Sequence, residues 1–153
     1  MKAKQHLPYP TELQSKLHAL HKELNNAVKR FKSLSQIAKS EWLISFYKAK
    51  LQERNQFRLE LKTHLETNYA KLESSRTVAG ALNRLHTKVK VMFDNDHDQV
   101  SLTKATYHEE SLLDVYQFVL IEPQIIEDDL IELLKNHVEK IESDIKLMRT
   151  FET

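Results

Sequence analysis

The chain has 153 residues, a mass of 18.0 kDa, 41% hydrophobic residues and 29% charged residues, which fits one globular domain with a buried core. It contains no cysteine, so disulfides, thiolate chemistry and cysteine-bound metal sites are excluded. One glycine and three prolines leave few sharp turns. The composition therefore predicts an all-α protein built from a few long helices.

The net charge of +1 hides a strong segregation along the chain. Residues 1–90 carry 18 Lys and Arg against 7 Asp and Glu, a net charge of +11, whereas residues 91–153 carry 5 against 15, a net charge of −10. The simplest interpretation is that the two halves attract each other within one bundle. Head-to-tail oligomerisation and a basic face that binds polyanions are the alternatives. Aromatic and basic residues do not interleave in the pattern of a single-strand binder, so we do not expect nucleic-acid binding.

The first predicted helix follows an N-terminal tail of residues 1–10. Thr11 and Gln14 have the spacing of a capping box. Apolar residues then recur every three or four positions, which is typical of one amphipathic helix. They are Leu13, Leu17, Leu20, Leu24, Val28, Phe31, Leu34 and Ala38.

A second helix is predicted over about 41–73 from the apolar periodicity. Its buried face includes Trp42, Phe57 and Tyr69, and it is interrupted by Lys50, Glu53 and Arg54. A shorter amphipathic helix is predicted over 77–93. The polar run 94–98 lacks the glycine and the distal glutamate of a calcium-binding loop, and we interpret it as a solvated linker.

The C-terminal part predicts two more helices, over about 98–121 and 124–151. Pro123 separates them, because the residue before a proline avoids helical geometry. The segment between the second and third main helices is long enough to run back along the bundle. We therefore expect residues 1–153 to form a single all-α domain, a ferritin-like up-down four-helix bundle with a helical crossover connection.

Counting residues from the predicted turns locates polar side chains at a common height inside the bundle. Glu109 and His137 each lie fourteen residues from Pro123, and both fall on apolar stripes. Glu53 lies thirteen residues from Ser40, and in parallel helices it is expected at the height of Glu109. The sequence therefore predicts Glu53, Glu109 and His137 as one inward-facing group, the candidate ligands of iron or manganese.

This group lacks part of the ligand set of a ferritin-like di-metal centre, in which two helices each supply a Glu-x-x-His motif. No such motif occurs in the chain. Ala27, Gln56 and Leu134 stand where further carboxylates or a histidine are needed. A redox-active di-iron site is therefore not expected.

Two other interpretations of the group remain open. The first is a hydrogen-bonded polar layer completed by Tyr116, Arg54 or water, because buried ionisable groups need partners. The second is a weaker mononuclear metal site helped by Glu60 and His64, which share a helix face at i and i+4.

Three segments of the chain resemble an uncharacterised bacterial four-helix-bundle family, a domain of unknown function of the ferritin-like superfamily. Residues 53–61 contain Glu-Arg-x-x-Phe-x-x-Glu-Leu, which is similar to the second helix of that family. Residues 77–82, Thr-Val-Ala-Gly-Ala-Leu, are similar to its Ser-Val-Ala-Gly-Ala-Leu segment, and Glu109-Glu110 followed by Tyr116 is similar to its next helix. The resemblance implies the fold and leaves the activity open.

Together these patterns predict a non-enzymatic helical-bundle protein that acts by self-association, as a homo-oligomer such as a dimer, or by binding a protein partner. No cofactor is expected under this interpretation. The alternative is a ferritin-like protein that binds iron or manganese at a degenerate core site. The N-terminal residues lack the apolar stretch of a signal peptide and no apolar run is long enough to span a membrane, so we expect a cytoplasmic location.

Overall fold

The computed structural model describes residues 11–68, 97–121 and 127–152. These residues form four α-helices and no strand. The helices are α2 (Thr11–Ile37), α3 (Glu41–Asn68), α5 (His97–Leu120) and α6 (Asp128–Thr150). The predicted all-α four-helix bundle is thereby confirmed for this part of the chain.

The observed helix ends lie close to the predicted ones. The first helix ends one residue before Ala38, and the third main helix begins at His97, one residue earlier than predicted. The last helix begins at Asp128 rather than near residue 124. The predicted tail 1–10, the continuation of the second helix over 69–73 and the predicted helix 77–93 all lie outside the described residues.

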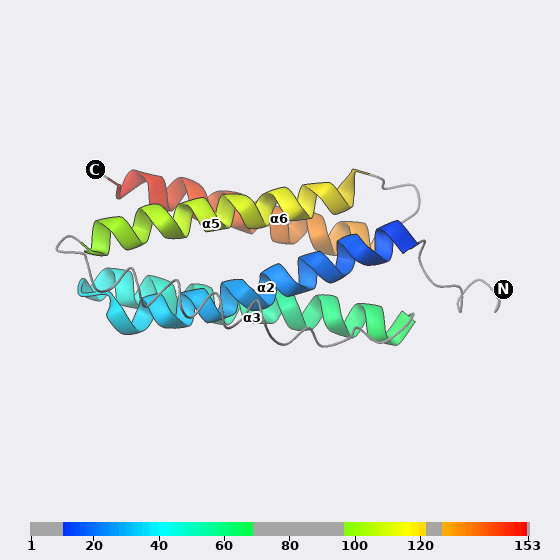
Figure 1. Cartoon of the computed structure of the whole chain (residues 1–153), viewed down its shortest axis with the longest axis horizontal. Helices are drawn as coiled ribbons and strands as arrows, with labels where there is room; N and C mark the ends of the chain where they lie inside the picture. The colour runs from blue at the N-terminus through cyan, green and yellow to red at the C-terminus, as the bar shows by residue number, and fades with distance from the viewer. Residues whose placement is uncertain (1–10, 69–96, 122–126, 153) are drawn as a thin grey trace.

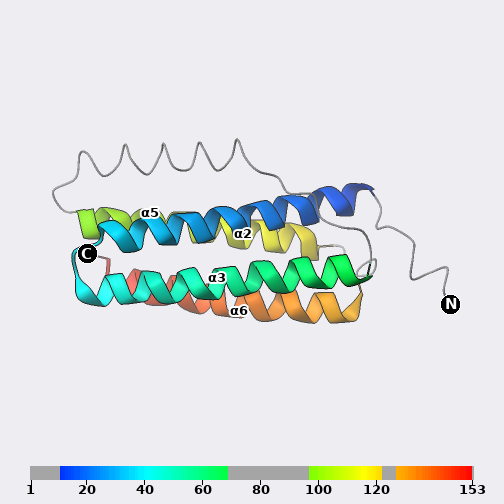
Figure 2. The same ribbon diagram turned by 90° about the horizontal axis from the view of Figure 1, so that it is seen from below.

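Neighbouring helices in the bundle run in opposite directions. Helix α2 packs against α3 and α5, α5 packs against α6, and α3 also contacts α6. Figures 1 and 2 show α3 and α5 running in the same direction on opposite corners of the bundle, with α2 and α6 running the other way. The end of α3 and the start of α5 therefore lie at opposite ends of the bundle.

The apolar stripes of the four helices meet in one core. On α2 the predicted stripe is buried, except that Ala27 is fully buried where Val28 had been expected. One prediction on α3 is wrong, because Trp42 is 42% exposed and lies at the edge of the core. Its ring stacks on Phe46 at a centroid distance of 5.2 Å and contacts Phe151 at 4.3 Å.

The turn between α2 and α3 is held by the first turn of α5. The Asp98 carboxylate accepts hydrogen bonds from the backbone N–H groups of Lys39 and Ser40, at 2.8 Å and 2.7 Å. One turn further along α5, the Ser101 hydroxyl is hydrogen bonded to the phenol of Tyr47 at 2.9 Å, and burial raises the pKa of Tyr47 to about 12. These contacts fix the two helical hairpins relative to each other at one end.

Candidate functional site

A charged side chain, Arg54, occupies a core position in the middle of α3. It is fully buried, and it lies in the interruption of the apolar face between Tyr47 and Phe57. Isolated charges are not stable in a protein interior unless they are paired and hydrogen bonded. The contacts of Arg54 therefore define the most unusual feature of this bundle.

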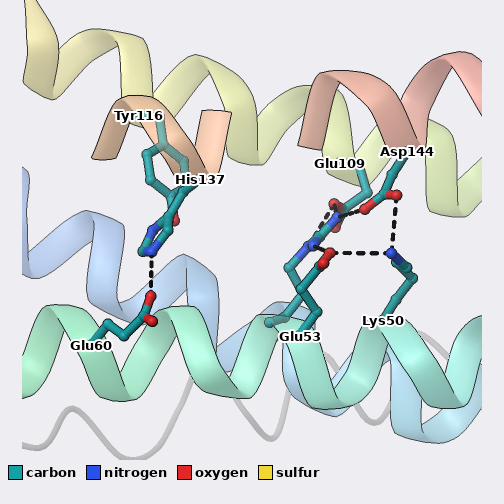
Figure 3. A network of polar contacts seen from close by, with 8 residues as sticks. Lys50, Glu53, Glu60, Glu109, Tyr116, His137 and Asp144 are labelled. Carbon is teal, nitrogen blue, oxygen red and sulfur yellow. Dashed lines mark hydrogen bonds and ion pairs between the residues drawn. The ribbon is translucent and has the colours of Figure 1, made fainter. Parts of the chain in front are cut away.

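The Arg54 guanidinium contacts three carboxylates from three helices, Glu53, Glu109 and Asp144, which are labelled in Figure 3. Its Nη2 atom donates to Glu109 Oε1 at 2.6 Å and to Asp144 Oδ2 at 2.8 Å. Its Nε atom also donates to Glu109 Oε1, at 2.9 Å, and its Nη1 atom donates to Glu53 Oε1 at 2.6 Å. We call Arg54, Glu53, Glu109 and Asp144 the arginine layer.

Two further cations accompany the arginine layer. Lys50 donates to Glu53 at 3.1 Å and to Asp144 at 3.0 Å, so these two carboxylates have a second cationic partner. Arg30 of α2 is also buried. Burial lowers the pKa of Arg30, and the negative charge of Glu109 partly opposes that effect. The three cations and the three carboxylates balance in formal charge.

The protonation states within the layer follow from its geometry. Burial by itself would lower the pKa of Arg54, but Glu109 and Asp144 raise it above the ordinary value, so the guanidinium stays charged. Burial would raise the pKa of Glu53, but Arg54 and Lys50 outweigh it and lower that pKa. Burial raises the pKa of Asp144, although Arg54 and Lys50 oppose that effect.

A second polar group lies further along the bundle (Figure 3). We call its residues His137, Tyr116 and Glu60 the histidine layer. Nδ1 of His137 is hydrogen bonded to the phenol of Tyr116 at 2.7 Å, and Nε2 is hydrogen bonded to Glu60 Oε1 at 2.8 Å. The imidazole stacks on Phe57 with a centroid distance of 3.9 Å and an interplanar angle of 12°. Glu60 reaches the surface, where it also accepts a hydrogen bond from Gln56 at 3.1 Å.

The hydrogen bonds of the histidine layer fix its tautomer. A carboxylate only accepts, so His137 Nε2 carries the proton that is donated to Glu60. In the neutral ring Nδ1 is then an acceptor, and the Tyr116 hydroxyl donates to it. Burial raises the pKa of Tyr116 well above 10. Burial lowers the pKa of His137 despite the opposing effect of Glu60, so the neutral ring is favoured.

This arrangement predicts a loss of stability in mild acid. The unfolded state binds a proton at His137 near pH 6.5, whereas the folded state binds it at a lower pH, so the free energy of unfolding falls as the pH drops below about 6.5. His21 has a pKa lowered by burial as well and contributes in the same direction. Denaturant titrations between pH 7 and pH 5 should show a shallower decrease in His137→Gln. The control variant His21→Gln should retain the His137 contribution, and an unchanged slope in His137→Gln would contradict the assignment.

The two layers correct the predicted height of His137. Glu53 and Glu109 lie together, as predicted, because both contact Arg54. His137 does not join them, since it lies seven residues from Asp144 along α6, about 10 Å in a helix. Arg54 contacts both Glu109 and Asp144, so these two carboxylates lie at one height, and Tyr116 and His137 contact each other at another. The sequence midpoint of each pair falls between residues 126 and 127. The pairing of α5 with α6 is therefore centred there rather than on Pro123.

The second pair of candidate residues, Glu60 and His64, lies on the surface. Both line an open groove of about 640 Å³ between α3 and α6, to which Asp129 and Leu133 also contribute. His64 Nε2 is 3.3 Å from Glu127 Oε1. The shared face predicted for Glu60 and His64 is therefore present.

The arginine layer does not fit a shared metal ion. A cation bound by both Glu53 and Glu109 would have to displace the Arg54 guanidinium, and His137 is held two helical turns away. Among the described residues, no group of three or more acidic or histidine side chains is placed to hold a metal ion. Metal binding by Glu53, Glu109 and His137 stays a prediction.

Sequence reasoning missed Asp144 and Arg30 as members of the polar core. Asp144 follows His137 by seven residues, which is the spacing that returns to the same helix face after two turns. Arg30 directly precedes Phe31 in the buried stripe of α2. Both the spacing of Asp144 from His137 and the position of Arg30 beside Phe31 can be read from the sequence. Neither pattern distinguishes a buried charged residue from one at the boundary of the core.

The fold and these two layers define a class: an antiparallel four-helix bundle with a charge-neutralised polar interior. Residues 12–122 match the family described as Domain of unknown function (DUF2383). This match covers more than half of the chain, so the chain belongs to that family. No curated protein and no solved structure matches the chain. Among the described helices, none has an apolar stretch long enough to cross a membrane.

Proposed function

We propose that this protein is a non-enzymatic, ferritin-like helical bundle that acts through its outer faces, by self-association or by binding a protein partner. The observation that supports this most is the position of Arg54. Its Nη2 atom lies within hydrogen-bond distance of Glu109 and Asp144, the place where carboxylates of a di-metal bundle would meet a metal ion. A permanent side-chain cation there supplies the positive charge that a metal ion would otherwise provide to these carboxylates.

The ferritin-like topology belongs to the same proposal. It is supported by the parallel directions of α3 and α5 (Figure 1), since such a pair requires a connection that runs the length of the bundle. The proposal also places the protein in the bacterial cytoplasm.

The second candidate function is binding of iron or manganese. The groove is the observation that favours it, because Glu60 and His64 both line it, and a carboxylate with an imidazole suits these metals. Here the ligands would be Glu60 and His64. The site at Glu53, Glu109 and His137 is less favoured, since Arg54 lies between the first two.

Metal analysis of protein purified without chelators separates these candidates. The primary proposal expects iron and manganese far below one ion per chain. One ion per chain that is lost in His64→Ala but kept in His137→Ala would favour the groove. One ion per chain that is lost in both Glu109→Gln and His137→Ala would contradict the role given to Arg54. His18→Ala, at an exposed position on α2, is the matched control.

A further inference from the structure

The outward face of α5 carries large apolar side chains that no described helix covers. Helix α5 packs against α2 and α6 on its inner sides, and its remaining side faces away from the bundle (Figures 1 and 2). Tyr107, Phe118 and Ile121 are 63%, 56% and 67% exposed, and Val100 is 38% exposed. Apolar side chains grouped on one exposed face are a mark of an interaction surface.

These side chains follow the spacing of a coiled-coil seam. Steps of four and three residues alternate along the whole face, which is the 3.5-residue period by which one helix keeps one face toward a partner helix. We call this face the α5 seam, and its members are Val100, Lys104, Tyr107, Ser111, Asp114, Phe118 and Ile121.

The seam contains one cation and one anion, placed symmetrically. Lys104 and Asp114 are both exposed, and each lies five residues from Glu109 along the helix. They are ten residues apart, about 15 Å in a helix, too far to pair with each other. An antiparallel copy of the same helix, centred at residue 109, would bring each Lys104 opposite an Asp114.

We propose that the α5 seam is the interface of a two-fold symmetric dimer, in which α5 of a second copy of this chain docks antiparallel. The inference rests on the self-association included in the proposed function, and it names the surface. In this register Lys104 lies opposite Asp114 of the second copy, and the same pair recurs across the axis. A self-complementary patch of this kind is what a two-fold interface requires.

Two more pairs of the seam fit the same register, whereas Ile121 lies opposite residue 97, beyond the seam. Val100 lies opposite Phe118 of the second copy, which pairs an aliphatic with an aromatic side chain. Tyr107 lies opposite Ser111, so the more exposed of the two aromatic rings of the seam meets a small residue near the axis. Lys16 lies over the Phe118 ring at 4.3 Å, which holds that ring in place before docking. A shift by one heptad would instead place Lys104 against Ile121 and leave Asp114 without a cation.

The expected dimer is reversible. One helix of 24 residues is about 36 Å long, and a single pair of helices buries less surface than a permanent interface. Four exposed apolar side chains on each chain and two ion pairs per dimer are consistent with a dissociation constant in the micromolar range, roughly 1–100 μM. The monomer and the dimer should therefore both be seen over an ordinary range of concentrations.

Charge reversal on the seam tests the proposal by sedimentation velocity over a concentration series. Lys104→Asp places two like-charged pairs in the interface, as does Asp114→Lys, and each is expected to weaken dimerisation at least tenfold. The double variant Lys104→Asp/Asp114→Lys restores both pairs with opposite sign and is expected to dimerise within about threefold of the wild type. Lys135→Asp, an exposed reversal on α6, is the matched control and should dimerise normally.

Each outcome has a defined meaning. Weakening in both single variants with rescue in the double variant supports the antiparallel seam. A dimer that none of the three variants weakens would overturn the seam and leave self-association through another face standing. Weakening without rescue would overturn this pairing of Lys104 with Asp114. A wild-type chain that stays monomeric up to about 1 mM would overturn the dimer and leave only the partner-binding form of the proposed function.

Orientation is tested separately with single cysteines, because the chain has none of its own. A mixture of Val100→Cys and Phe118→Cys is expected to form a disulfide between the two variants under mild oxidation. Val100→Cys alone is expected to form far less, since the two residues 100 lie at opposite ends of an antiparallel pair. Efficient cross-linking of Val100→Cys alone would contradict the antiparallel arrangement.

Discussion

Replacing Arg54 with methionine is expected to lower the free energy of unfolding by about 3–5 kcal/mol. Methionine fills much of the same volume, so the loss is mainly electrostatic. Glu109 is fully buried, and all of its described hydrogen bonds are to Arg54. The substitution therefore leaves an uncompensated charge in the core. Chemical denaturation at pH 7, with tryptophan fluorescence and circular dichroism as probes, measures the effect.

Arg58→Met is the matched control for this prediction. Arg58 lies one turn further along α3, is only partly buried, and donates its described hydrogen bonds to Asn55. Its removal is expected to cost less than about 1 kcal/mol. Equal losses in the two variants would show that Arg54 acts as a space-filling side chain rather than as the internal cation.

The second large effect is expected at Phe57, which lies between the two polar layers. Its ring stacks on His137 and also lies 5.3 Å from Arg54 Cζ. Phe57→Ala is expected to lower the free energy of unfolding by about 3–5 kcal/mol, because it removes a buried ring and leaves a cavity. It should also raise the pKa of His137 toward 6.5, since burial is the main cause of its lowered value.

Two measurements check the Phe57 prediction. Denaturation gives the stability, and a pH titration followed by NMR of the His137 ring gives the pKa. Leu59→Ala is the control, since Leu59 is 40% exposed on the same helix and should change stability by less than about 1 kcal/mol. A normal loss of stability with an unchanged His137 pKa would mean that Phe57 does not control the hydration of the histidine.

The segregation of charge along the chain has a structural counterpart in the arginine layer. Its cations Arg30, Lys50 and Arg54 all come from the basic part, whereas Glu109 and Asp144 come from the acidic part. The layer thus supports the interpretation in which the two halves attract each other within one bundle. The charges that attract each other here are buried pairs, and salt screens their interaction much less than it screens that of surface pairs.

The helices could be predicted from the sequence because their apolar periodicity is long and regular. The stripe from Leu13 to Ala38 defines α2 almost to the residue. Heights inside the first hairpin were also predictable, since its turn is short and centred near Ser40. In agreement with this, Phe31 contacts both Tyr47 and Arg54, at 5.9 Å and 5.8 Å.

The pairing of α5 with α6 could not be predicted, for a physical reason. A proline marks where helical geometry is interrupted, but it does not fix how many residues the chain uses to reverse direction. The midpoint lies three to four residues beyond Pro123. In an antiparallel pair, an error in the assumed midpoint shifts the expected pairing of the two helices by twice its size. The expected height of His137 was therefore wrong by two helical turns.

The role of Arg54 was only partly predictable. The sequence shows a charged interruption of an apolar face, and Arg54 was one of several partners considered for Glu53 and Glu109. Which of Lys50, Glu53 and Arg54 enters the core depends on helix rotation by a fraction of a turn. Asp144 lies on the opposite hairpin. Its spacing from His137 predicts a shared helix face, but its contact with Arg54 is a tertiary contact that this spacing does not specify.

A double-mutant cycle between Arg54 and Glu109 tests the central claim most directly. The free energies of unfolding of the wild type, Arg54→Met, Glu109→Leu and Arg54→Met/Glu109→Leu are measured under one set of conditions. If Arg54 is the internal cation of Glu109, the double variant costs less than the sum of the single variants by at least about 1 kcal/mol, and it is more stable than Arg54→Met alone. Additive costs, within about 0.5 kcal/mol, would contradict the account.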